Sequence, residues 1–206
     1  MKFVTSDTHF FDTSIIKHYN FAPARSHFFN VNDMNFQIIR SWNSVVSGTD
    51  LVYHCGDIGV YYKSSNKEAL LSILMQLHGS IIFIKGNHDS RDLFKYLQKN
   101  NFFLNEKNGI KKFYFHNVGT YFKYNHRQFF LTHYPLFFGK TQNSINLHGH
   151  IHYNSIPIKE NINIGVDSKD FDYFPKKEKP TFGTPLSMQQ IEFLIKAKSD
   201  DFYKRR

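Results

Sequence analysis

The 206-residue chain has a single cysteine, Cys55, which excludes an internal disulfide bond. Disulfide-dependent proteins work in oxidising compartments, so this scarcity favours a reducing cytosol. The opening residues, MKFVTSDTHF, carry an early acid and predict a strand rather than a secretory leader. The sequence also has no apolar run of about 18 residues, the length that a membrane-spanning helix needs. We therefore expect a cytoplasmic protein without a membrane partner.

Acidic residues are in the minority, because 26 Lys and Arg face 17 Asp and Glu, for a formal net charge of +9. This balance favours an anionic partner such as a phosphate-bearing substrate, and nucleic acid is an alternative. Solubility alone would also explain a charge this dispersed. The bias towards Phe, Asn, Lys, Ile and Tyr is typical of AT-rich coding DNA, as in a low-GC bacterium or its phage.

Hydrophobic residues make up 41% of the chain, and 23 are Phe, so disorder is excluded and an aromatic-rich core is expected. We expect Phe28, Phe29 and Phe36 to belong to that core. The length fits one domain spanning residues 1–206.

The periodicity of apolar residues changes halfway along the chain. In the first half, strands alternate with helices predicted at 32–46, 67–78 and 90–99. The second half is mostly strand, with segments predicted at 111–117, 119–125, 127–132, 145–150 and 161–166. A surface loop is expected over 168–185, before a last helix that begins with Ser187 as N-cap and Gln190 three residues later. This order predicts an α/β (α+β) domain with mixed sheets covered by helices.

Polar clusters follow the predicted strands. They are Asp7 and His9, Asp57, Asn87 to Asp89, His133, and the three histidines of the segment LHGHIH at 147–152. Ligands bind at the carboxyl ends of strands in open α/β sheets, so we expect these clusters to meet at one edge.

Seven of these side chains are candidate metal ligands, too many for one ion and suitable for two that share a bridging carboxylate. Mixed Asp, His and Asn ligands suit divalent Mn, Fe, Zn or Ni. Two metal ions about 3.5–4 Å apart can clamp an in-line displacement at phosphorus. Gly56, Gly86 and Gly149 would let the backbone turn sharply, so that short side chains reach an ion.

Five motifs in this order resemble the calcineurin-like metallophosphoesterase superfamily, in particular its small bacterial and phage members. They are D-x-H at 7–9, G-D at 56–57, G-N-H-D at 86–89, a histidine before Tyr-Pro at 133, and G-H-x-H at 149–152. The resemblance implies a four-layer α-β-β-α sandwich of two mixed β-sheets flanked by helices.

The same resemblance implies a role for each motif residue. Asp7, His9 and His152 would bind the first metal ion, Asp57 would bridge both, and Asn87, His133 and His150 would complete the second site. His88 would protonate or polarise the leaving oxygen, and Asp89 would orient the His88 ring. We expect two divalent ions, Mn first, with Fe, Zn or Ni as alternatives.

The activity that the resemblance implies is a two-metal phosphodiesterase, which attacks nucleotide or other small phosphodiesters with a metal-activated hydroxide. A nuclease or a phosphomonoesterase is the alternative within the enzyme class. From another class, a non-catalytic scaffold or nucleic-acid-binding protein on the same fold is the rival hypothesis, although every motif position is retained.

Residues beside the motifs are expected to support the site or are candidates to contact the substrate. We expect His148 to support its neighbours, His54 to be a buried, hydrogen-bonded strand residue, and Cys55 to belong to the core. Arg25 and Arg91 are candidates to contact a substrate phosphate, because a guanidinium matches phosphate geometry. A solvated position on a helix is the stronger expectation for Arg91.

Overall fold

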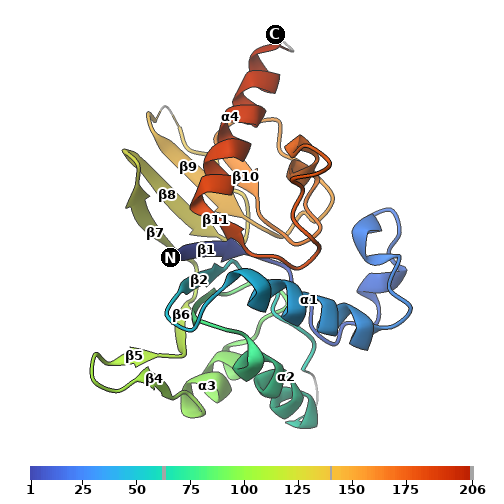
Figure 1. Cartoon of the computed structure of the whole chain (residues 1–206), viewed down its shortest axis with the longest axis vertical. Coiled ribbons are helices and arrows are strands. Elements are labelled where there is room, and N and C mark those ends of the chain that lie inside the picture. The colour runs from blue at the N-terminus through green and yellow to red at the C-terminus, as the bar shows by residue number, and fades with distance from the viewer. Residues whose placement is uncertain (62–63, 140, 205–206) are drawn as a thin grey trace.

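The computed structural model describes residues 1–61, 64–139 and 141–204, whose longer strands form two mixed sheets (Figure 1). The first sheet has the order β11 (Leu186–Ser187), β1 (Lys2–Thr5), β2 (Leu51–His54), β3 (Ser80–Ile84) and β6 (Phe113–His116). The second has the order β10 (Asn161–Asn163), β9 (Ser144–His148), β8 (Arg127–Thr132) and β7 (Gly119–Tyr124). Within these two sheets, as far as the structure describes them, β11 and β7 pair antiparallel with their neighbours and the other pairs are parallel.

Three helices cover one face of the first sheet: α1 (Val31–Val45), α2 (Ser64–Gln76) and α3 (Arg91–Lys99) (Figure 1). Successive side chains of a strand point to opposite faces, so Phe3 and Val52 pack under these helices, whereas Val4 and Tyr53 face the other way. Each central strand of the first sheet is therefore buried on both faces.

A second core lies on that other face. Val4 and Tyr53 pack there with Phe129 and Leu147 of the second sheet and with the apolar side of α4 (Met188–Lys204). The predicted α/β class, with two mixed sheets and flanking helices, is confirmed.

Side-chain caps fix where the helices begin. Asn30 accepts hydrogen bonds from the backbone N–H groups of Asn32 and Asp33 at the start of α1, and Ser90 accepts one from Leu93 in α3. At α4, Ser187 and Gln190 exchange reciprocal bonds, in which each side chain accepts the other residue's N–H. This is the predicted capping box.

Four features differ from the sequence-based expectation. Residues 168–185 are not a purely surface loop, because the short helix η3 (Lys169–Tyr173) buries Asp170 and Phe171. Phe29 and Phe36 are 94% and 65% exposed, so neither belongs to the core. A hairpin of β4 (Phe103–Asn105) and β5 (Ile110–Lys111) was not predicted. Helix α2 begins at Ser64, three residues before the predicted start.

Two short 3₁₀ helices, η1 (Ile15–Lys17) and η2 (Pro23–Arg25), follow β1 and contact each other. Arg25 of η2 donates to the carbonyls of Asp7 and Thr8, so η2 lies beside the edge where the polar loops gather. Among the described helices, none has both the length and the hydropathy that crossing a membrane requires.

Candidate functional site

The loops that follow the strands meet at one edge of the two sheets, where backbone hydrogen bonds join them. The N–H groups of Asp7 and His9 donate to the carbonyls of Gly56 and Asp57 over 2.9 and 3.1 Å. In the second sheet, Gly149 donates to the carbonyl of His133 over 3.0 Å. Strands β1, β2 and β3 are parallel, so their carboxyl ends share this edge.

Six of the seven predicted ligands form two clusters of three. Asp7, His9 and His152 make the first cluster, and Asp57, His133 and His150 make the second. Within each cluster, one candidate ligand atom per residue lies within 4.8 Å of the others. The resemblance assigned Asp7, His9 and His152 to one site and His133 and His150 to the other, and the structure groups them in the same way, with Asp57, the expected bridge, in the second cluster.

Asp57 connects the two clusters. Its Oδ2 atom lies 3.6 Å from Nε2 of His9 in the first cluster and 3.4 Å from Nε2 of His133 in the second. Its other oxygen, Oδ1, accepts the backbone N–H of His88 over 2.9 Å. One carboxylate thus faces both clusters while its second oxygen holds the G-N-H-D loop.

The seventh predicted ligand, Asn87, lies against the second cluster. Its Oδ1 atom is 2.6 Å from Nε2 of His133 and 2.8 Å from Nδ1 of His150. The residue is exposed, so its amide closes the outer side of the cluster.

In three of the histidines the outer ring nitrogen, Nδ1, lies beside a hydrogen-bond acceptor. This contact orients the ring and with it the inner nitrogen, Nε2. Nδ1 of His133 lies 2.8 Å from the carbonyl of Cys55, an acceptor, so Nδ1 carries the proton. Nδ1 of His9 and Nδ1 of His152 meet carboxylates in the same way, those of Asp12 and Asp167, at 3.2 and 2.9 Å. Each Nε2 is then left with a lone pair.

This arrangement fits divalent metal ions. The lone pair of Nε2 on His133 faces oxygens of Asn87 and Asp57, and the buried Nε2 of His9 has no hydrogen-bond partner among the described residues. Acceptors that converge without a donor are costly in a protein interior, and a cation between them removes the cost. An imidazole whose outer N–H is held by a carboxylate or carbonyl is the usual form of a metal-binding histidine.

Several of these residues have a backbone conformation that side chains other than glycine rarely adopt. Positive φ angles occur at Asp7 (57°), His9 (47°), Asp57 (56°), His150 (73°) and His152 (46°). Such backbone costs of order 1–3 kcal/mol per residue and is concentrated at functional sites. Because five of the seven predicted ligands share it, the strain serves the placement of these side chains.

The glycines of the motifs let neighbouring side chains and backbone approach closely, and this matters more than any sharp turn they permit. A Cβ atom on Gly86 would overlap Oδ1 of Asp57, and one on Gly149 would overlap a carboxylate oxygen of Asp7. Only Gly56 of the three has a positive φ, 96°, and a Cβ there would lie 2.6 Å from the backbone of Gly86. The two loops therefore pack backbone to backbone beside Asp57.

His88 stands at the open side of the site. The residue is exposed, and its ring centroid lies 5.4 Å from that of His9. Arg91 is also exposed, in the first turn of α3. A contact between Arg91 and a substrate phosphate stays a prediction.

The carboxylate of Asp89 binds backbone N–H groups rather than the ring of His88. This buried carboxylate accepts the N–H groups of Asp57, Ile58 and Gly86 over 2.8, 3.0 and 2.9 Å. A bond to the His88 imidazole is not among those of the described residues, so the expectation that Asp89 orients that ring needs correction. Burial raises the pKa of Asp89, and the carboxylate fixes the Asp57 loop to the G-N-H-D loop.

Arg25 also departs from expectation. Its side chain is fully buried, with Nε donating to Oδ2 of Asp167 over 2.6 Å and the two terminal nitrogens donating to the carbonyls of Asp7 and Thr8. No part of the guanidinium is open to a substrate phosphate. Sequence reasoning missed its partner Asp167. Burial by itself would raise the pKa of Asp167, but Arg25 and His152 outweigh this effect and lower it.

The buried histidines outside the clusters behave as expected. His54 accepts the N–H of Gly56 and lies 2.9 Å from the hydroxyl of Thr8, and burial lowers its pKa to about 3. His148 meets the carbonyl of Gly149, and burial lowers its pKa to about 4. Cys55 is buried in the core between the sheets.

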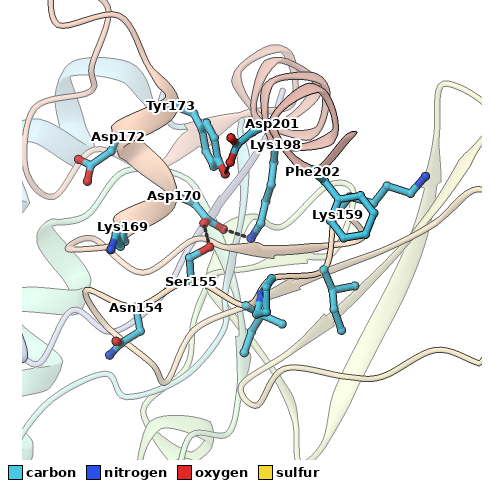
Figure 2. Close-up of a pocket in the computed structure, with 13 residues that line it drawn as sticks. Asn154, Ser155, Lys159, Lys169, Asp170, Asp172, Tyr173, Lys198, Asp201 and Phe202 are labelled. Atoms are coloured by element: carbon cyan, nitrogen blue, oxygen red, sulfur yellow. Dashed lines mark hydrogen bonds and ion pairs between the residues drawn. The ribbon is translucent and has the colours of Figure 1, made fainter. Parts of the chain in front are cut away.

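A separate cavity of about 530 Å³ lies between η3, the end of α4 and residues 154–159 (Figure 2). Its floor is an ion pair in which Nζ of Lys198 lies 2.8 Å from Oδ2 of Asp170, and Ser155 donates to the same carboxylate. Asp170 also accepts the N–H of Asn163, whose side-chain amide donates to the carbonyl of His152 over 2.7 Å. The pair therefore supports the loop that carries a ligand of the first cluster.

Comparisons with known proteins agree with this picture. The sequence profile of a family described as calcineurin-like phosphoesterase matches residues 3–182. The uncharacterized protein MJ1445 of Methanocaldococcus jannaschii is 33% identical over 172 residues, which cover 80% of this chain and 81% of that protein. The crystal structure of the protein of unknown function AQ665 from Aquifex aeolicus has a TM-score of 0.62 at 22% identity, covering 94% of this chain and 98% of the other. That last likeness concerns the fold alone.

Proposed function

This chain belongs to the calcineurin-like phosphoesterase family, and we propose that it is a phosphodiesterase that hydrolyses nucleotide or other small phosphodiesters with two divalent metal ions. The observation that carries the proposal is the position of Asp57, whose Oδ2 faces the imidazoles of both clusters. A carboxylate placed between two ligand sets is what a shared pair of ions requires.

The geometry of the two clusters supports one assignment of residues to the ions. Asp7, His9 and His152 would hold one ion, Asn87, His133 and His150 the other, and Asp57 both. Nitrogen and oxygen ligands in this mixture suit Mn, with Fe, Zn or Ni as alternatives. When bound, the ions would supply an activated nucleophile and neutralise the charge that develops at phosphorus.

The chain's own groups supply positioning and a proton. His88 is exposed beside His9, and its backbone is held by Oδ1 of Asp57, so its ring can reach the leaving oxygen of a bound ester. Protonation of that oxygen avoids the release of an alkoxide and contributes about 10²–10⁴-fold in rate.

The test is hydrolysis of bis-p-nitrophenyl phosphate by the metal-free protein after addition of Mn²⁺. We expect turnover only with the metal, and loss of turnover and of one Mn²⁺ equivalent in Asp57→Asn. His88→Gln should keep a normal Mn²⁺ content. It should lose about 10²–10⁴-fold in rate on a diester with an alkoxide leaving group, such as a 2′,3′-cyclic nucleotide, and less on bis-p-nitrophenyl phosphate, whose p-nitrophenolate leaves without a proton. Glu106→Gln removes an exposed carboxylate from the β4–β5 turn and should change neither turnover nor Mn²⁺ content. Full metal loading without turnover, with any of the four metals, would favour a non-catalytic scaffold.

The net charge of +9 favours a second candidate within the same class, a nuclease. Single-stranded DNA, a 2′,3′-cyclic nucleotide and a phosphomonoester in the same assay would separate the three activities. Preference for the polymer, with a steep loss of rate as salt is added, would identify the nuclease.

A further inference from the structure

Two exposed aromatic side chains lie against ligand histidines from different clusters. The ring of Phe21 is 4.4 Å, centroid to centroid, from that of His152 in the first cluster. The ring of Tyr134 is 4.5 Å from that of His150 in the second cluster. The two aromatic rings therefore flank the candidate metal centre.

Each ring has one side packed and another side open. Phe21 is 41% exposed and Tyr134 is 52% exposed, although both belong to loops that are otherwise braced. The carbonyl of Phe21 accepts the N–H of Tyr153 over 3.2 Å, and the carbonyl of Tyr134 accepts the Thr132 hydroxyl over 2.6 Å. Single exposed aromatic residues are common on protein surfaces. What distinguishes these two is a fixed position on the histidines of the site.

Braced aromatic rings with an open face are suited to stacking. A nucleic-acid base offers a π-face of the same kind, and a ring that is already held in place loses little conformational entropy on binding. An alkyl ester gains nothing comparable from such a surface.

We propose that Phe21 and Tyr134 stack the bases of the substrate, so that the natural substrate is a phosphodiester bearing at least one nucleoside. This inference rests on the proposed phosphodiesterase activity and narrows its substrate class. Phe21 and Tyr134 are specificity residues, because they recognise the group that the phosphate carries.

The test compares two substrates with the same leaving group, thymidine 5′-(p-nitrophenyl phosphate) and methyl p-nitrophenyl phosphate, in the Mn²⁺-loaded protein. The p-nitrophenyl ring is common to both, so its own stacking cancels in the ratio of their kcat/KM values. We expect this ratio to exceed ten, and to fall about tenfold in Phe21→Ala or Tyr134→Ala, the effect of losing one stacked base. Tyr134→Phe should keep the ratio, as should Phe29→Ala, which removes an exposed aromatic ring without a ring contact to the clusters among the described residues.

The Ala variants also remove packing from the imidazoles, so a second pair of variants separates this effect from the loss of stacking. Phe21→Leu and Tyr134→Leu keep apolar bulk on the imidazoles and remove the aromatic face, so the ratio should fall in them while the Mn²⁺ content stays at two equivalents. An unchanged ratio in all four of the Ala and Leu variants would overturn the stacking proposal.

Failure of the phosphodiesterase itself would look different, with neither substrate turned over by the loaded protein. Stacking is then still measured by calorimetric titration of the Mn²⁺-loaded protein with thymidine 5′-monophosphate and with methyl phosphate. Equal affinity for the two would overturn the proposal, and tighter binding of the nucleotide that is lost in Tyr134→Ala would support it.

Discussion

The guanidinium of Arg25 donates from Nε to Oδ2 of Asp167 over 2.6 Å, with both side chains fully buried and the two residues 142 positions apart in the chain. The same carboxylate oxygen lies 2.9 Å from Nδ1 of His152. A single oxygen thus accepts a hydrogen bond from the arginine of η2 and orients a candidate metal ligand in the loop after β9. The buried pair of Arg25 and Asp167 thereby connects η2 to the candidate metal site.

Replacing Arg25 should lower both the stability and the metal affinity of the protein. Arg25→Met leaves Asp167 buried without its cation, and breaking a buried pair in this way costs about 3–5 kcal/mol of unfolding free energy. Mn²⁺ affinity should also fall about 10–100-fold, because the Asp167 carboxylate that orients His152 loses the guanidinium that holds it in place. Urea unfolding and calorimetric titration measure the two effects. The exposed Arg40→Met should stay within about 0.5 kcal/mol of wild type, and an equally small change in Arg25→Met would contradict the role.

A methyl group on Gly86 should disable the site. The added Cβ would overlap Oδ1 and the backbone nitrogen of Asp57, so the bridging carboxylate must move. A misplacement of about 1 Å can cost about 100-fold in rate, and we expect at least that loss for Gly86→Ala with Mn²⁺. Gly48→Ala, at a position with nothing within 4 Å of the new Cβ, is the matched control and should keep full activity. Full activity in both variants would show that the loop tolerates the shift.

The buried His54 should make the metal-free protein sensitive to mild acid. Burial lowers its pKa from 6.5 to about 3, so below pH 6.5 the unfolded chain takes up a proton that the folded protein does not. Stability should therefore fall with pH between 6.5 and 3, by about 1.4 kcal/mol per pH unit from this residue. Urea unfolding in EDTA at pH 7, 5.5 and 4 should show a slope that much smaller in His54→Gln. The exposed His126→Gln is the control, and equal slopes in wild type and His54→Gln would refute the assignment.

The ion pair below the separate cavity should support the site from a distance. Lys198→Met leaves the carboxylate of Asp170 buried without its cation, and we expect a loss of about 3–5 kcal/mol. Because Asp170 positions Asn163, and Asn163 holds the carbonyl of His152, Mn²⁺ affinity should fall as well. Lys196→Met removes an exposed lysine of the same helix and should alter neither quantity. Lower stability with unchanged Mn²⁺ affinity would limit the pair to a structural role.

The sequence alone predicts which residues gather in the two clusters, because short motifs at the ends of strands name residue types with few other uses. Its predictions weaken where a role depends on a distant partner. The residues around Arg25 in the sequence do not indicate that it pairs with Asp167. Likewise, only the folded structure reveals that Asp89 accepts three backbone N–H groups of the neighbouring loops. A guanidinium on a loop looks free to bind phosphate until the residue that neutralises it is found.

Local composition also gave a wrong prediction for residues 168–185. Lys, Pro and Gly there favour a solvated loop, yet Phe171 and Phe174 pack into the core and Asp170 pairs with Lys198 of α4. Conversely, an aromatic residue is expected in a core on hydrophobicity alone, and Phe29 and Phe36 instead lie on the surface around α1. Burial in both cases is decided by which element packs alongside, which no window of neighbouring residues contains.

The first cluster joins residues from the two ends of the motif region, since Asp7 and His9 come directly after the first strand and His152 comes after the ninth. During synthesis, a ribosome-bound chain carries Asp7 and His9 long before it carries His152. A complete first metal site cannot exist until both sheets have formed and docked. Metal uptake would then report the completion of folding.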